Sequence, residues 1–440
     1  MNVFDILLPP IYLLVILLLA YKYKLKHQHE HIAFKYFLPG LIAKIIGAIA
    51  LGLVYFYYYG GGDTLNYYYT AIALVDVLFE NPSNFLHVYF GTPLFSEYYL
   101  LNSPKNFTYW VNDEYSYFVS KCFVPFIFIG GKSYITTAIL VASGCYVGVW
   151  NLFMIYIKEF PHLIKQLCIP ILFMPSVIFW GSGVLKDSLT LSATCLYVYA
   201  FYWLFVQKKY KLKFAFLLLF TSFLLVSIKP YILLALLPGS ILWIVATRLS
   251  NIKNVLLKLL AAPLIIVTGA AILLSVMNYL EADLGQYSID NVIVTASGAQ
   301  KDLKQSYYSG NTFDIGDYEP TITGLLSVSH KAIFAALFRP TLFDTKNVVM
   351  LISAIENTSI LGYCIFLLIR LKVFGFFKLV KSHPLVLFSF IFSIFFALSV
   401  GVSISNFGTL VRLKIPCIPF FISSLVVVQS MAKPKKNLYL

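Results

Sequence analysis

The sequence has few charged residues for its length. Only 12% of its 440 residues are Asp, Glu, Lys or Arg, whereas 60% are hydrophobic and 17% are aromatic. A soluble domain has about 25% charged and about 45–50% apolar residues, so the composition excludes an ordinary soluble fold. We expect an all-α protein, a polytopic bundle of transmembrane helices that forms a single integral membrane domain over residues 1–440.

The chain also lacks the spacings that mark disulfide, metal and nucleotide sites. Its six cysteines are scattered, and no CxxC spacing occurs among them. We therefore expect neither a disulfide framework nor a metal site. No Walker motif and no glycine-rich dinucleotide motif is present, so we expect no nucleotide and no other cofactor.

Long apolar runs dominate what is present. Runs of about 17–25 residues are typical of membrane-spanning helices, and we predict about eleven. They cover residues 3–21, 37–58, 133–157, 166–181, 188–206, 214–228, 231–247, 257–279, 346–369, 384–402 and 410–430.

Positive charge gathers in alternate segments between these runs. Six short segments hold 20 of the 33 Lys and Arg residues but only two of the 19 acidic residues. The positive-inside rule assigns these segments to the cytoplasm, with the N-terminus outside and the C-terminus inside. The net charge of +14 is then a topology signal and not a sign of nucleic-acid binding. The six segments are Tyr21–Lys35, Lys158–Lys165, Gln207–Lys213, Arg248–Lys258, Arg370–Lys381 and Met431–Leu440.

Two segments on the predicted outer side, residues 59–132 and 281–345, are too long to be simple connectors. Long ordered loops in compact proteins usually carry function. Residues 71–79 and 329–338 have helical apolar spacing and predict helices along the outer interface. The many tyrosines and tryptophans fit either an interfacial aromatic belt or a sugar-stacking surface. The candidate sugar contacts are Tyr67, Trp180 and His330, and His330 is also a candidate base.

Four cations lie on the predicted outer side, against the charge bias. They are Lys186, Lys229, Arg339 and Arg412, and Lys414 follows the last of them closely. A negatively charged lipid-linked substrate explains such cations, because arginine donates two parallel hydrogen bonds to phosphate oxygens. Two alternatives stay open: Lys229 snorkels to water, or Lys186 belongs to a tight interhelical turn.

Two acidic residues are candidate catalytic groups. Asp63 follows three glycines and either caps the next helix or contacts a substrate hydroxyl. Glu356, followed by Asn357, lies inside a predicted span. A carboxylate in hydrocarbon is costly unless it is paired or solvated, so Glu356 is expected to face a cation or a cavity.

The segment GDTLNYY at residues 62–68 resembles a G-x-D-x-x-x-Y type segment of polysaccharide repeat-unit polymerases, in the oligosaccharide and O-antigen polymerase group. That segment lies in their first large outer loop. Here a glycine directly precedes Asp63, although Gly61 fills the earlier place. The many spans, the cation-rich late loop and Arg412 near the outer end of a span are similar to the same group.

The resemblance implies polymerisation of repeat units on undecaprenyl diphosphate at the outer leaflet of the bacterial inner membrane. In that reaction the four outer cations would bind the donor diphosphate, and Asp63 or Glu356 would act on the acceptor hydroxyl. The implied partners are a polyprenyl-linked glycan, membrane lipid and other envelope-glycan assembly proteins, with no nucleic acid.

Two alternatives remain open. Membrane glycosyltransferases that use a sugar on polyprenyl phosphate also place an acid early on the outer side, but often after the first span, whereas Asp63 follows the second. A glycolipid transporter or flippase would use the same cations to line a passage.

Overall fold

The computed structural model describes residues 4–91, 110, 113–250, 291–305, 312–345 and 348–432. The regular structure within these residues is helical, apart from one isolated bridge between Thr312 and Asn406. Eight of the described helices are long and apolar enough to cross a membrane, or nine spans if one bent pair is counted. The all-helical fold is confirmed, and the long apolar helices support a multi-pass membrane protein.

The chain divides into two compact units, each built from segments that are not contiguous in the sequence. Unit 1 comprises Met1–Glu159, Leu172–Tyr199 and Phe220–Lys229. Unit 2 comprises Phe160–Ile171, Ala200–Leu219 and Pro230–Leu440.

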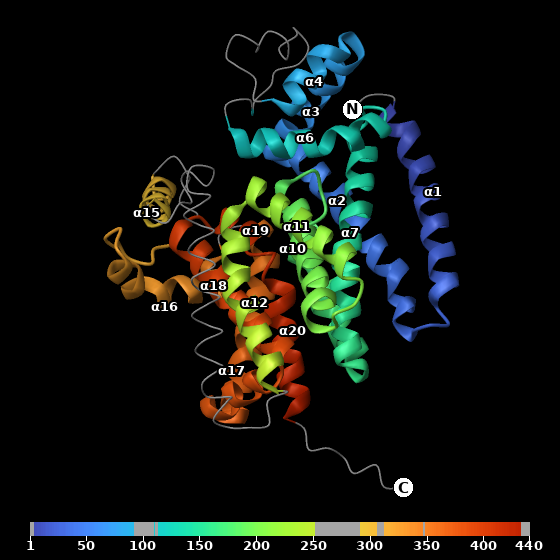
Figure 1. Ribbon diagram of the computed structural model, residues 1–440. Helices are drawn as coiled ribbons and strands as arrows, with labels where there is room; N and C mark the ends of the chain where they lie inside the picture. Colours follow the sequence, from blue (N-terminus) through green and yellow to red (C-terminus); the bar gives the residue numbers. More distant parts are fainter. Residues whose placement is uncertain are drawn as a thin grey trace. The chain divides into compact units, whose positions relative to one another are not determined.

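Three long helices form the main body of unit 1 (Figure 1): α1 (Phe4–His27), α2 (Phe37–Leu53) and α7 (Tyr134–Glu159). Helix α2 packs on both α1 and α7, and also on the short helix α9 (Pro175–Trp180). A Cβ atom on Gly47 of α2 would lie 2.2 Å from the carbonyl oxygen of Ile178 in α9. The close contact between these helices therefore requires a residue without a side chain. Unit 1 also takes most of α10 (Lys186–Phe201) and the end of α11 (Lys211–Ile228).

The first predicted outer segment contains three helices of unit 1: α3 (Asp63–Glu80), α4 (Pro82–Phe90) and α6 (Glu114–Ile129). Helix α3 packs along α6 and against α4. The chain enters α3 through Gly62, whose φ of +119° is strained for any residue with a side chain. The predicted helix at residues 71–79 lies inside α3 and is confirmed, while its place at a membrane interface stays a prediction.

Helix α18 (Pro384–Ser403) lies at the centre of unit 2 and packs on α12 (Pro230–Ser250), α16 (Ile322–Phe338) and α20 (Ile418–Met431). A Cβ on Gly401 would lie 2.1 Å from the carbonyl oxygen of Ala332, so α16 and α18 meet backbone to backbone. The remaining elements of this unit are α8 (Ile164–Leu172, except its last residue), α15 (Val292–Leu303), η8 (Leu342–Asp344), α17 (Val348–Ser382) and α19 (Phe407–Leu413).

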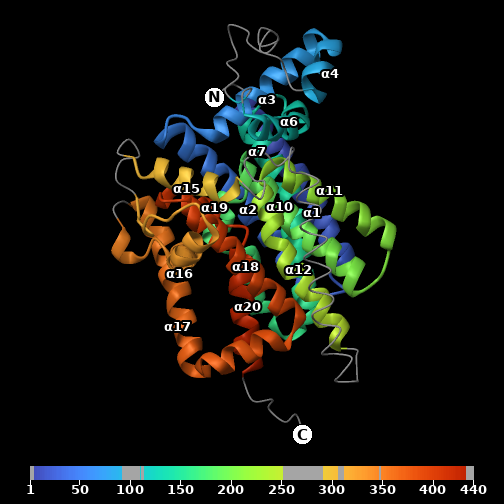
Figure 2. The same cartoon turned by 60° about the vertical axis from the view of Figure 1, so that its left-hand side comes forward.

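Helix α17 contains a non-helical residue, Lys372, at which its second part turns across one end of unit 2 before α18 begins (Figure 2). Helices α16 and α19 lie at the other end of the unit. The predicted cytoplasmic connector Arg370–Lys381 is thus helical. The second part of α17 lies at the end of the unit opposite α16 and α19.

Several predicted spans differ in the structure. Residues 166–181 form the two short helices α8 and α9, because Pro175 lacks an N–H group and disfavours a helical conformation at Met174, which is extended. The last span is the bent pair α19 and α20, at 68° to each other. The predicted span 257–279 lies outside the described residues. The predicted break at Lys229 is confirmed, since α11 ends at Ile228 and α12 begins at Pro230.

Candidate functional site

The turn after α16 holds the best-defined cluster of polar groups in unit 2. Helix α16 ends at Phe338, and Thr341 and Asp344 then close a short capping box around η8. The backbone N–H and the hydroxyl of Thr341 donate to Oδ2 of Asp344 at 2.8 and 2.9 Å. These bonds fix the carboxylate beside Arg339.

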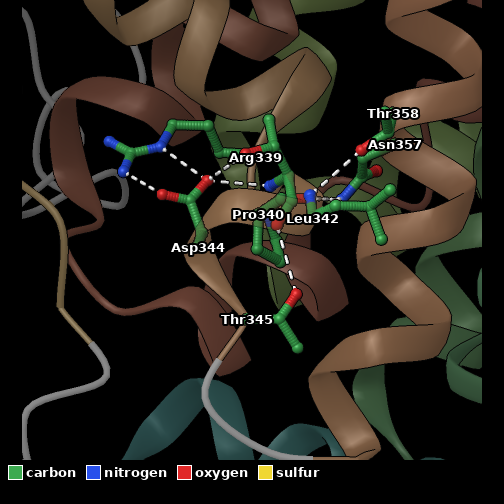
Figure 3. Close-up of polar contacts among 8 residues, drawn as sticks. Arg339, Pro340, Leu342, Asp344, Thr345, Asn357 and Thr358 are labelled. Atoms are coloured by element: carbon green, nitrogen blue, oxygen red, sulfur yellow. Dashed lines mark hydrogen bonds and ion pairs between the residues drawn. The ribbon is translucent and has the colours of Figure 1, made fainter.

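Arg339 is held on three sides. Its Nε and Nη2 donate to the two carboxylate oxygens of Asp344 at 3.2 and 2.5 Å (Figure 3). Its guanidinium carbon also lies 5.4 Å from the ring centre of Phe313 and 5.0 Å from that of Phe407. Cation–π attraction to two rings adds to the ion pair. The guanidinium is therefore fixed in one orientation.

Part of the guanidinium remains accessible. Arginine has five N–H donors, and Asp344 takes two of them. None of the other donors of Arg339 has an acceptor among the described residues, and its side chain is 27% exposed. Figure 3 shows one terminal nitrogen directed away from Asp344. The free edge can donate two parallel hydrogen bonds to a phosphate or carboxylate.

The charge of Asp344 supports this arrangement. Burial raises the pKa of Asp344, but hydrogen bonds from Arg339 and Thr341 lower it, and the net pKa lies below the ordinary value of 3.8. The carboxylate is thus ionised at neutral pH and holds the arginine in place.

Two buried side chains, those of Lys414 and Asn357, donate hydrogen bonds to the backbone of the same turn. Lys414 donates from Nζ to the carbonyl oxygen of Arg339 at 3.1 Å and to Oδ1 of Asn357 at 2.7 Å. Asn357 in turn donates from Nδ2 to the carbonyl oxygen of Pro340 at 3.0 Å. Glu356, 7% exposed, interacts electrostatically with Lys414. Glu356 was expected to face a cation or a cavity, and Lys414 is a cation close enough to interact with it.

The other candidates of unit 2 lie on α19 and α16. Arg412 is partly buried in the last turn of α19, where a cation is favoured by the helix dipole. His330 is exposed on α16. The structure thus connects Arg339 with Glu356 through Lys414, and it places Arg412 on the short helix that ends beside Lys414.

The two predicted cations of unit 1 have different surroundings. Lys229 is buried and forms an ion pair with Asp187 in the first turn of α10, with 2.5 Å between Nζ and Oδ1. It does not snorkel to an exposed surface. Lys186 is the first residue of α10 and is partly exposed.

The early acid and the aromatic candidates also belong to unit 1. Asp63 is the first residue of α3 and is partly exposed, with Gly62 as the N-cap. A negative charge in the first turn suits the helix dipole. Tyr67 is fully buried, and its ring centre lies 5.5 Å from that of Trp110 in a stacked arrangement. Trp180 ends α9 and is partly exposed.

Sequence reasoning missed Lys44, a buried lysine of α2. Its Nζ donates to the carbonyl oxygens of Gly181 and Val177 at 2.7 and 3.3 Å, at the end of α9. This lysine therefore caps α9 and fixes the turn before Lys186. A single lysine inside the apolar run 37–58 was the signal for it.

Among the described residues, no group of three His, Cys, Asp or Glu side chains is placed to hold a metal ion. No protein-family model, curated protein or solved structure matches the chain. Function is therefore inferred from the chemistry of the residues themselves.

Proposed function

We propose that the protein is a membrane glycosyltransferase that joins lipid-linked oligosaccharide repeat units at the outer leaflet of the bacterial inner membrane. The donor is a glycan on undecaprenyl diphosphate. The observation that supports this most directly is the free edge of Arg339, which is oriented by Asp344 and two aromatic rings. Helix α16, which ends just before Arg339, lies at the end of unit 2 opposite the second part of α17, a segment that the positive-inside rule assigns to the cytoplasm.

The reaction needs a group that binds a departing diphosphate. The bond between the anomeric carbon and the phosphate oxygen breaks, and a bond from that carbon to the acceptor oxygen forms. The acceptor proton passes to a carboxylate, and the diphosphate leaves with increased negative charge. Arg339 stabilises this charge because its donors are already oriented before the reaction.

Two carboxylates are candidates for the proton acceptor. Glu356 belongs to the Arg339 cluster through Lys414, and Asp63 stands at the start of α3 in unit 1. Comparison of the variants Glu356→Gln and Asp63→Asn in a chain-extension assay separates the two. The base is the residue whose neutral variant loses chain extension while the protein remains in the membrane.

The gene deletion tests the proposal. Accumulation of single lipid-linked repeat units on a gel is the expected result. A repeat unit that lacks one sugar would instead indicate a monosaccharide transferase, and units confined to the inner leaflet would indicate a flippase. Unchanged glycans would reject all three activities.

Complementation with Arg339→Ala makes the test specific to the site. We expect chain extension to fall about 10²–10³-fold, the usual effect of removing one preorganised donor to a developing anion. The protein level in the membrane should be unchanged. Lys331→Ala, which removes an exposed cation from α16, is the matched control and should extend chains normally. Normal chain length with Arg339→Ala would exclude this arginine from the reaction.

A further inference from the structure

We propose that Lys414 and Asn357 are positioning residues that set the place of the Arg339 guanidinium for the diphosphate. This inference rests on the proposed function for the identity of the ligand. It concerns two residues that neither carry the reaction nor contact the substrate in the proposal above.

Three hydrogen bonds form a closed triangle around the turn. Lys414 binds the carbonyl oxygen of Arg339, Asn357 binds the carbonyl oxygen of Pro340, and Lys414 binds Asn357. The carbonyl groups of Arg339 and Pro340 are therefore both held by Lys414 and Asn357, which are hydrogen-bonded to each other. The orientation of these groups determines the direction in which the side chain of Arg339 leaves the backbone.

The chemistry of the three groups permits only one arrangement. A lysine ammonium only donates and a backbone carbonyl only accepts. The amide of Asn357 must then turn its oxygen to Lys414 and its nitrogen to Pro340. A side chain without both a donor and an acceptor cannot close the triangle, which explains an asparagine at this position.

Helix α19 links the triangle to the guanidinium. Its first residue, Phe407, lies under the guanidinium of Arg339, and Lys414 follows its last residue and binds the Arg339 carbonyl. Phe407 at the start of α19 thus contacts the guanidinium of Arg339, and Lys414 just after α19 binds its backbone carbonyl. Lys414 is the C-cap residue of α19, and the chain bends by 68° between α19 and α20 after it.

Burial shows how these two residues can act on a ligand. Lys414 is 0% exposed and Asn357 is 1% exposed, so neither side chain lies at the surface. Lys414 offsets the charge of Glu356, because a buried charge without a partner is costly. Its hydrogen bond to the Arg339 carbonyl is not needed for that role, and it is explained if the lysine also fixes the geometry of a binding group.

The test is diphosphate binding by the purified full-length protein in detergent, with farnesyl diphosphate as the probe. We expect Lys414→Met and Asn357→Ala each to weaken binding at least about tenfold, because a displaced guanidinium loses charge-assisted hydrogen bonds to the diphosphate. Ser359→Ala is the control, since its hydrogen bond stays within α17. If Lys414→Met does not accumulate, Asn357→Ala gives the same test without removing a charge.

Each variant is then combined with Arg339→Ala. Residues that act through Arg339 should have no further effect on the dissociation constant once the arginine is gone, whereas a loss of general stability would lower binding in both backgrounds. Equal effects in both backgrounds, or normal binding by both single variants, would overturn the inference.

The two proposals fail differently. Binding that depends on Arg339, Lys414 and Asn357, together with unchanged glycans in the deletion strain, would reject the polymerase and retain the positioning role. Probe binding that does not depend on Arg339 would reject the positioning role, whatever the glycan gels show.

Discussion

Each unit of the protein contains an ion pair whose cation was predicted to lie on the outer side. The two pairs differ in how far their side chains are exposed. Lys229 and Asp187 in unit 1 have side chains that are 4% and 0% exposed. Arg339 and Asp344 in unit 2 are 27% and 14% exposed. A cation on the predicted outer side can therefore form a buried structural ion pair or stay accessible to a ligand. The charge bias of the sequence does not distinguish these two roles.

The type of cation accounts for part of the difference. A lysine ammonium is a compact charge, whereas the planar guanidinium carries donors on several edges. Arg339 can therefore bind Asp344 with one edge and still present another. The buried pair contributes to the interior of unit 1, and the partly exposed pair supplies an oriented donor.

The largest expected effect comes from breaking the buried pair. Lys229→Met should reduce the free energy of unfolding by about 3–5 kcal/mol, because it leaves the carboxylate of Asp187 buried without its cation. Thermal unfolding in detergent measures the change. Lys211→Met, which removes an exposed lysine from the start of α11, is the control and should unfold close to the wild type.

A double variant separates the pair from the packing around it. Lys229→Met combined with Asp187→Leu should recover most of the lost stability, because no buried charge remains. If the double variant is as unstable as the single one, the ion pair is not the cause of the loss, and the contrast with unit 2 would disappear.

A smaller effect is expected at the partly exposed pair of Arg339 and Asp344. Asp344→Asn should lower the free energy of unfolding by about 1 kcal/mol or less, since partly exposed pairs contribute little. The same unfolding measurement, made side by side with Lys229→Met, compares the two units directly. A loss as large as that of Lys229→Met would mean that both pairs have the same structural role.

The smallest effect is a pH dependence. The pKa of Asp344 is below its ordinary value, so its contribution to stability is complete above pH 3.8 and is lost as the pH falls through the lower pKa of the folded state. The stability difference between wild type and Asp344→Asn should stay constant from pH 7 to about pH 5 and shrink only in stronger acid. A difference that vanishes near pH 6 would contradict the lowered pKa.

The local features of the fold were predictable from the sequence. Long apolar runs predicted most of the long helices, and Lys229-Pro230, which interrupts one such run, predicted the break between α11 and α12, because proline at a helix start has no N–H group to satisfy. The three glycines lie directly before Asp63, and Gly60 and Gly62 have positive φ at the entry into α3. Each of these signals lies within a few residues of its effect.

The partners of the polar residues were not predictable in this way. Lys229 and Asp187 are 42 positions apart, and Lys414 and Arg339 are 75 positions apart. Their contacts depend on which helices pack together, and a single sequence carries no local signal for that. What the sequence does display is the isolated polar residue in an apolar run, as at Lys44, Glu356 and Asn357. In the structure these three positions are all buried.

The contact between α16 and α18 has a consequence for the position of Arg339. A Cβ at Gly401 would lie 2.1 Å from the Ala332 carbonyl, so the backbones of the two helices are in direct contact at this point. Sliding of one helix past the other would bring larger residues into that contact. We therefore expect α16 and α18 to move as one piece, so that Arg339, which directly follows α16, keeps its place relative to α18 when a ligand binds its accessible edge.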